Sequence, residues 1–356
     1  MNKYFEEIPY IRAIACMMVV LVHISAISHS NSFFADNWSL YINQISRVGT
    51  PIFAVISAFL LFNSIKDKKL NLKRFFKSRT TKIVLPFIIW TIVYLAVKSY
   101  LGKDVFSNMG QVINYFLLGT SHYHLYFIIT VIQFYIIFPI LQLPKNRIVI
   151  LVMFLLSIPL NFYWYNIDNF TFDNTIINSI LNHRSFILNW IAYFMFGAVL
   201  VYFYKELISF TYKARYLIFS AFILMMFMMV NEITHGVVLT SSREENLFYV
   251  PIVILFLLTT FNYIKNFNRT VNVITLIGNY SMGIYLIHPL IIIFLRETFA
   301  LYPLVSYQLI IVFMVVLTLS ILITQLILFI PLSKYIIPVG KKKKSITPKI
   351  NVKEVI

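Results

Sequence analysis

Residues 11–27 read IRAIACMMVVLVHISAI, an apolar run with one charged side chain, Arg12, near its start. The run is close to the length that a helix needs to cross the hydrocarbon core of a bilayer. It is long for the apolar part of a cleavable secretory signal, and it carries His23 as well as Arg12. We therefore predict that this run is a retained signal anchor and the first membrane span.

Runs of the same kind recur along the chain, which is 60% hydrophobic but only 12% charged. Soluble domains carry about 25% charged residues, so most of this apolar surface must face lipid. The pattern predicts an all-α, polytopic transmembrane helix bundle of about ten spans, the last of which is long enough to tilt or to break at Pro331. The predicted spans are residues 8–28, 45–63, 82–101, 123–142, 147–163, 186–204, 214–231, 247–264, 272–295 and 304–332.

The formal net charge of +17 has the distribution of a membrane protein rather than that of a nucleic-acid-binding protein. Lys and Arg gather in alternate loops, above all in residues 64–82, as the positive-inside rule requires when both the N- and the C-terminus are cytoplasmic. We divide the chain into a transmembrane domain, residues 1–340, and a basic cytoplasmic tail, residues 341–356. Membrane lipid, and no nucleic acid, is the expected partner of these cations.

Arg12 and His23 are the first pair of polar residues that lipid should not tolerate. Eleven helical positions separate them, which returns both to one face of the helix and places His23 about 16 Å further along the axis. An ionisable side chain within a span costs about 2.5–3.5 kcal/mol on insertion scales, so such residues usually carry a function. The alternatives are an Arg12 that reaches the inner headgroups and a His23 that bonds a neighbouring helix.

Two further polar groups contain histidines that fall in the outer half of the predicted topology. Ser281, Tyr285 and His288 are spaced by four and three residues, which places them on one face of the predicted span 272–295, just before Pro289, which would kink it. Their alternative role is polar contact between helices. His122 and His124 lie at the outer entrance to the predicted span 123–142, where an aromatic belt is the alternative interpretation.

Two shorter elements complete the set of candidate sites. Arg47 opens the stretch RVGTPIF, residues 47–53, at the outer start of the second span. Arg79 and Lys82 lie where the basic loop becomes the third span, and two cations at that place could hold the phosphates of a cytoplasmic cofactor. The alternative is the positive-inside signal itself. A single cysteine, Cys16, excludes a disulfide framework and a thiolate metal site, and no metal is expected.

Taken in their order along the chain, these five polar elements resemble the membrane acyltransferase-3 family over nearly the whole sequence. The resemblance rests on residues 10–15 (YIRAIA) with His23, 49–53 (GTPIF) with 57–60 (SAFL), Arg79 and Lys82 with Pro86, 124–127 (HLYF) with Tyr135 and Pro139, and 281–289 (SMGIYLIHP). The chain departs from the family at Ala58, where glycine is frequent, at Lys82, where a second arginine is frequent, and at Tyr126, where tryptophan is frequent. Lys82 would bind a phosphate as a point charge, without the bidentate hydrogen bonds that arginine can form.

The resemblance implies a membrane O-acyltransferase that moves an acetyl or succinyl group from cytoplasmic acyl-CoA to a sugar hydroxyl of a cell-surface glycan or exopolysaccharide. Within the family, the first span, the Gly-Thr-Pro element and the span-four pattern are similar to those of members assigned to the export or succinylation of poly-N-acetylglucosamine. A bacterial plasma membrane and contact with a polysaccharide synthase complex would follow. The implied roles are donor binding for Arg12, Arg79 and Lys82, general base or acyl carrier for His23, orientation or oxyanion stabilisation for Ser281, Tyr285 and His288, and acceptor binding for Arg47, His122, His124 and Tyr126.

Two other classes of function fit parts of the same sequence. An exporter of a surface polysaccharide such as poly-N-acetylglucosamine would also use many helices, aromatic outer loops and sparse charge. A receptor or structural membrane protein would leave the pair Arg12 and His23 unexplained. No Walker-type loop and no acidic residue deep in a span is present, which disfavours an ATPase and a carboxylate-based proton-coupled transporter.

Overall fold

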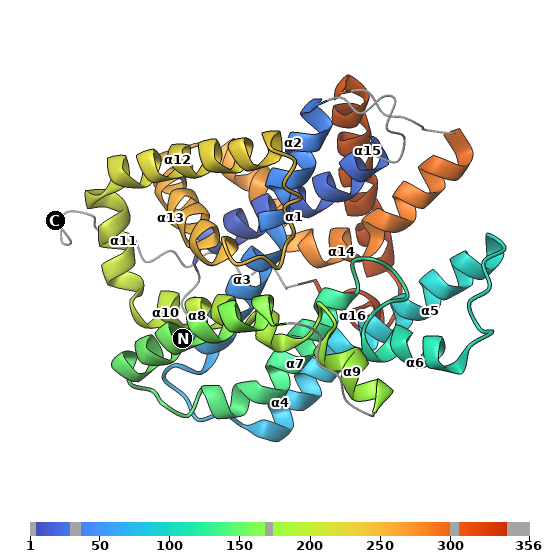
Figure 1. Ribbon diagram of the computed structural model, residues 1–356, viewed down its shortest axis with the longest axis horizontal. Coiled ribbons are helices and arrows are strands. Elements are labelled where there is room, and N and C mark those ends of the chain that lie inside the picture. The colour runs from blue at the N-terminus through green and yellow to red at the C-terminus, as the bar shows by residue number, and fades with distance from the viewer. Residues whose placement is uncertain (1–4, 29–36, 168–173, 300–305, 340–356) are drawn as a thin grey trace.

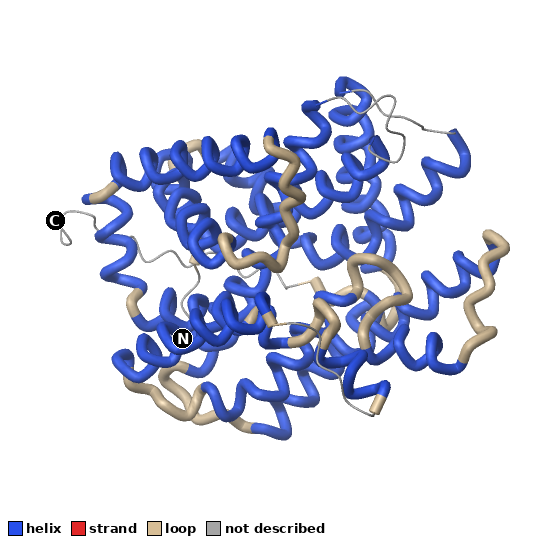
Figure 2. The backbone as a smooth tube through the Cα atoms, viewed as in Figure 1, coloured by secondary structure: helices blue, strands red, loops and turns tan. Residues whose placement is uncertain are grey.

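The computed structural model describes residues 5–28, 37–167, 174–299 and 306–339. Within these ranges the chain forms helices and loops and no strand, which confirms the all-α prediction (Figure 2). The helices are α1 Glu7–Ser28, α2 Asn37–Ile45, the 3-10 helix η1 Ser46–Val48, α3 Gly49–Ile65, α4 Leu72–Arg79, the π-helix η2 Thr80–Val84, α5 Leu85–Tyr100, α6 Met109–Leu117, α7 Tyr126–Leu141, α8 Arg147–Asn166, α9 Thr175–Leu181, the 3-10 helix η3 Ile187–Asn189, α10 Ile191–Tyr202, α11 Tyr204–Lys213, α12 Arg215–Thr234, α13 Asn246–Ile264, α14 Asn268–Phe299, α15 Ser306–Leu328 and α16 Ser333–Ile336.

Each predicted span overlaps with a helix in the part of the chain that the structure describes. Eight helical segments there are long and apolar enough to cross a membrane, and the bent pair α10 and α11 raises the number to nine. Helix α7, which corresponds to the predicted span 123–142, has 16 residues and is shorter than a typical span. The count of ten and the cytoplasmic termini therefore stay predictions, and the basic tail lies outside the described residues.

Two predicted spans differ in detail from the structure. Residues 186–204 do not form one helix, because α10 ends at Tyr202 and α11 turns away from it by 88°. The predicted span 304–332 ends early, since α15 stops at Leu328 and Pro331 follows in a turn. Helix α14, in contrast, continues through Pro289 to Phe299.

Helices α1 and α14 pack side by side at the centre of the assembly (Figure 1). They run in the same direction, because Gly278 lies against Pro9 near their starts and the His23 and His288 rings stack further along. A Cβ atom added to Gly278 would lie 2.0 Å from the carbonyl oxygen of Pro9, so only glycine allows this approach. The first and ninth of ten alternating spans would also run in the same direction.

A second tight contact sets α10 in the core between α3 and α8. A Cβ atom on Gly197 would lie 2.3 Å from the carbonyl oxygen of Val55 and 2.8 Å from the Cβ of Ala58. The neighbouring Phe194 stacks on Phe134 of α7 at a ring distance of 4.1 Å. Small residues thus let the helix backbones meet, as is common where lipid offers no hydrophobic driving force for helix association.

Candidate functional site

The parallel pair α1 and α14 brings the two predicted catalytic histidines together. The His23 and His288 rings stack with their centroids 5.3 Å apart and their planes at 23°. Deeper in the same contact, Cys16 Sγ lies 3.8 Å from the carbonyl oxygen of Ser281. His288 is fully buried, whereas His23 is partly exposed. His23 is therefore the ring of the pair that an incoming molecule can reach.

The turn between α6 and α7 adds two more imidazoles to this pair. His122 Nδ1 lies 3.2 Å from His124 Nδ1, so one of these nitrogens donates a hydrogen bond to the other. The His124 ring lies 5.6 Å from the His288 ring, and the Tyr123 ring lies 4.3 Å from the His23 ring. We call the group formed by His23, His122, His124 and His288 the histidine cluster.

Two tyrosines hold the turn against α14. Tyr94 of α5 donates a 2.6 Å hydrogen bond from its hydroxyl to the carbonyl oxygen of Leu286, and its ring stacks on His122 at 4.4 Å. Tyr285 of α14 donates its hydroxyl proton to the carbonyl oxygen of His124. Both phenols are buried, and each ties an α-helix far away in the sequence to the histidine cluster.

The environment of His288 determines its tautomer. His288 Nδ1 lies 2.8 Å from the carbonyl oxygen of Ile284, which can only accept, so Nδ1 carries the proton of the neutral ring. Nε2 then keeps its lone pair, and it is buried with no hydrogen-bond partner among the residues described. His124 Nε2 is buried and unpartnered in the same sense. Such nitrogens can accept a proton or orient a neighbour.

The two histidines of the turn favour the neutral state. Burial first, and then the charges of Lys98, His288 and Arg296, lower the pKa of His122 from 6.5 to about 3. His124 is also buried, and its Nδ1 lies within hydrogen-bond distance of the Nδ1 of His122. Two neutral rings can share the proton between their Nδ1 atoms, whereas two charged rings would repel each other.

This pKa shift predicts a loss of stability in mild acid. Because the folded-state pKa of His122 is about 3 and the reference value is 6.5, the unfolded chain binds the proton first as the pH falls. Stability is expected to decline from about pH 6.5 downward, by up to about 1.4 kcal/mol per pH unit for one fully buried group. Thermal unfolding of the purified protein in detergent checks this, with His122→Gln expected to flatten the dependence. His235→Gln, at an exposed site, is the control. The prediction would be contradicted if the thermal midpoint depended on pH equally in wild type and in both variants.

A cavity of about 340 Å³ opens beside the first half of α1 and the middle of α14. Its walls include all three cations that were predicted to bind the donor, Arg12, Arg79 and Lys82. They also include Ser281 and Tyr285, two of the predicted catalytic residues. Tyr285 belongs to both places, since its ring lines the cavity and its hydroxyl bonds the histidine-bearing turn.

The local structure explains how Arg79 and Lys82 reach the cavity. The π-helix η2 interrupts an otherwise α-helical stretch between Leu72 and Tyr100, with Arg79 just before it and Lys82 within it. Such π-helical turns are frequent at functional sites. The Arg79 guanidinium lies between the rings of Phe75 and Tyr135, at 5.6 and 5.3 Å, and its Nε is buried with no hydrogen-bond partner among the described residues.

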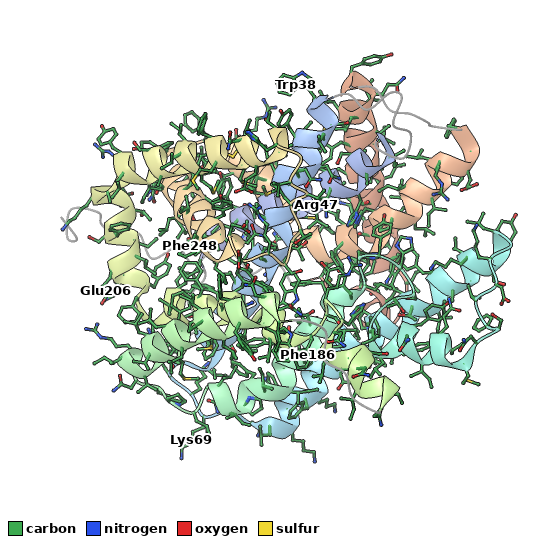
Figure 3. All side chains as sticks on the ribbon, viewed as in Figure 1. Trp38, Arg47, Lys69, Phe186, Glu206 and Phe248 are labelled. Atoms are coloured by element: carbon green, nitrogen blue, oxygen red, sulfur yellow. The ribbon has the colours of Figure 1, made fainter. Side chains whose placement is uncertain are left out.

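The predicted acceptor residues do not all join the histidine cluster. Arg47 donates from Nε and Nη2 to Asn43 Oδ1, at 3.2 and 3.0 Å, in the short η1 region that packs on α1. Figure 3 shows Arg47 within the assembly, whereas Trp38 and Lys69 point outward at its edges. Tyr126 lies under the guanidinium of Arg184, 4.0 Å from the ring centroid.

Sequence reasoning did not assign roles to Tyr94 and Arg184, although both contact the predicted residues. Tyr94 is a hydroxyl-bearing residue within the predicted apolar span 82–101, which could have marked the residue but not its partner on α14. Arg184 was one of the few cations of the outer segments, and its Nη2 donates a 3.0 Å hydrogen bond to the carbonyl oxygen of Tyr123. Among the described residues, no group of three or more His, Cys, Asp or Glu side chains could hold a metal ion.

The fold and the site define a multi-pass helical membrane protein with a cation-lined cavity next to a histidine cluster. Residues 5–328 match the model of the acyltransferase-3 family, described as an acyltransferase domain, and the chain belongs to that family. A relative from Staphylococcus aureus, named a probable poly-beta-1,6-N-acetyl-D-glucosamine export protein, is 29% identical over 315 residues, with 82% of this chain and 83% of the relative covered. A relative of the same name from Staphylococcus epidermidis is 27% identical over 306 residues, with 82% of each chain covered. No solved structure matches significantly.

Proposed function

We propose that this protein is a membrane-bound O-acyltransferase of the bacterial plasma membrane. It would move an acetyl or succinyl group from cytoplasmic acyl-CoA to a hydroxyl of a surface polysaccharide, in contact with the synthase that makes the polymer. The proposal rests on one observation, which is that the cavity adjoins the histidine cluster. Three cations, Ser281 and Tyr285 line the cavity, and Tyr285 also contacts the cluster. The family match supports the transfer chemistry, and the names of the relatives suggest a poly-N-acetylglucosamine acceptor.

The dimensions of the site suit a long, flexible thioester donor. Arg12 lies in the cavity wall, and His23 is about 16 Å further along the same helix at 1.5 Å per residue. The anionic end of acyl-CoA would pair with Arg12, Arg79 and Lys82, and the thioester arm would extend along α1 and α14. Its carbonyl would then arrive near the histidines, where the acceptor hydroxyl enters from the opposite side.

The transfer step needs one proton acceptor and one stabilised oxyanion. As the sugar oxygen attacks the thioester carbon, the hydroxyl proton moves to an imidazole nitrogen and a C–O bond forms. The tetrahedral oxyanion then collapses, the C–S bond breaks, and the imidazolium returns the proton to the leaving thiolate. The products are a sugar ester and coenzyme A with a free thiol, so atoms and charge balance.

The geometry supports different roles for the two stacked histidines. His23 is partly exposed and would be the general base, because it can meet the acceptor hydroxyl. His288 is fully buried with a fixed tautomer, and we assign it the positioning of His23 through the ring stack. The hydroxyl group of Ser281 is the candidate for stabilising the oxyanion. The Tyr285 hydroxyl donates its proton to the carbonyl oxygen of His124, so we assign Tyr285 an orienting role.

Deleting the gene separates this proposal from the second candidate, an exporter. The names of the relatives favour export, and a channel could also use the cavity and the aromatic turn. Secreted polymer that lacks its ester in the deletion strain supports acyl transfer. Polymer that stays trapped inside the cell supports export and contradicts the transferase assignment.

Replacing Arg79 by alanine is expected to raise the KM for acyl-CoA about tenfold or more, with a smaller effect on kcat. Arg79 would contribute a charge-assisted hydrogen bond to the donor that is present in both the ground state and the transition state. Arg79→Lys is expected to recover part of the loss, since lysine keeps the charge but not the planar geometry. Lys77→Ala, an exposed cation on the same helix, is the matched control. Equal KM values for the Arg79 and Lys77 variants would contradict the donor-binding role.

A further inference from the structure

An open cleft of about 550 Å³ lies between the end of α5 and helix α6, apart from the cation-lined cavity. Three side-chain amides contribute to its walls, from Asn108, Gln111 and Asn114. Among the residues that the structure describes, Lys98 is the one charged residue that lines the cleft, and Thr120 adds a hydroxyl. Neutral hydrogen-bonding groups thus predominate over charge in this cleft.

Helix α6 is amphipathic, and its orientation explains why the amides gather in the cleft. Met109, Ile113 and Phe116 recur at helical spacing and are exposed at 73%, 44% and 38%. Gln111 and Asn114 lie three residues apart on a different face of the helix. In the predicted topology α6 belongs to an outer segment, so its apolar face would rest in the outer membrane interface. Gln111 and Asn114 line the cleft on the other side of the helix.

The cleft adjoins the histidine cluster through two elements. On α5, Lys98 follows Tyr94 by one helical turn on the same face, and Tyr94 stacks on His122. On the turn after α6, Thr120 lines the cleft two residues before His122. The residue between them, Ser121, is buried and donates a 3.4 Å hydrogen bond to Thr91 Oγ1, which anchors the turn to α5.

We propose that this cleft binds the sugar units of a neutral, hydroxyl- and amide-bearing glycan chain next to the unit at the histidine cluster. The inference rests on the proposed function, because it supplies the acceptor subsite of that reaction. Amide side chains can donate and accept at once, which matches paired hydroxyls and N-acetyl groups. An anionic lipid headgroup is the competing ligand, but phosphate recognition usually draws on arginine or on several cations, and this cleft has one lysine.

The test measures binding of a short β-1,6-linked N-acetylglucosamine oligomer to the purified protein in nanodiscs of neutral lipid. The double variant Gln111→Ala/Asn114→Ala is expected to raise the dissociation constant about tenfold or more, because two hydrogen bonds are lost. Asn231→Ala removes an exposed amide at the end of α12 and is the matched control, with no change expected. Thermal unfolding of each variant checks that α6 stays folded.

The outcomes separate this inference from the proposed function. If wild-type protein esterifies the oligomer and the double variant binds and esterifies it equally well, the assignment of the cleft as a glycan subsite is wrong. The transferase proposal would still stand. Weakened binding by the double variant, with no ester formed by wild type, would support the subsite and count against the transferase. Binding of an anionic lipid in place of the oligomer, abolished by Lys98→Ala in nanodiscs doped with that lipid, would overturn the glycan assignment.

Discussion

Replacing His23 by alanine is expected to lower the rate of sugar ester formation between about a hundredfold and ten thousandfold, the usual contribution of a general base. The loss follows because His23 is the partly exposed ring of the stacked pair, whereas His288 is buried beneath it and cannot meet an acceptor. Ester on secreted polymer, measured by NMR, checks the prediction in cells. The membrane level of the variant should match wild type.

His235→Ala is the matched control for this variant. His235 is an exposed histidine that bonds only its own helix end, through the carbonyl oxygen of Asn231, and it lies outside the cluster. We expect its ester content to equal that of wild type. Unchanged ester in the His23 variant, with normal amounts of protein in the membrane, would remove His23 from the chemistry. A loss of equal size in both variants would likewise show no special role for His23.

Replacing Gly278 by alanine is expected to destabilise the folded protein by about 3 kcal/mol or more, at the upper end of the range for overpacking. The added Cβ would lie 2.0 Å from the Pro9 carbonyl oxygen, so the backbones of α1 and α14 would have to separate. The membrane level and the thermal midpoint in detergent should both fall. Activity of the protein that remains should fall as well, since the same helix pair aligns His23 with His288.

Val273→Leu tests whether that effect is specific to the helix contact. Val273 lies on the same helix but is 57% exposed, so a larger apolar side chain there meets lipid rather than backbone. Its membrane level should match wild type. Equal losses in the Gly278 and Val273 variants, or no loss in either, would contradict the close approach of α1 and α14.

The apolar spans and the stripe from Arg12 to His23 could be predicted from the sequence because both are properties of single helices. Periodicity places residues on a face, and hydropathy selects the helices that lipid accepts. The convergence of Arg12, Arg79 and Lys82 on one cavity could be proposed only from the family resemblance, since it depends on packing between α1, η2 and α14. The contact of His124 with Tyr285, 161 positions apart in the sequence, was not predicted, because it also depends on the packing between helices.

Other features lay beyond sequence reasoning for identifiable physical reasons. The 88° turn between α10 and α11 has no proline or glycine at the break, which lies at Phe203, so no local signal marks it. The role of Tyr94 depends on a hydrogen bond to a backbone carbonyl of α14, which no residue pattern encodes. At Ala58, where the family often has glycine, Gly197 on the facing helix provides the missing space.

Transfer across a sealed membrane tests the central claim most directly. The purified protein is placed in proteoliposomes, with labelled acetyl-CoA or succinyl-CoA outside and a β-1,6-linked N-acetylglucosamine oligomer enclosed. We predict alkali-labile label on the enclosed oligomer with wild-type protein and none with His23→Ala. Release of the oligomer from the vesicles, with no label on it from either donor, would contradict acyl transfer and point to export.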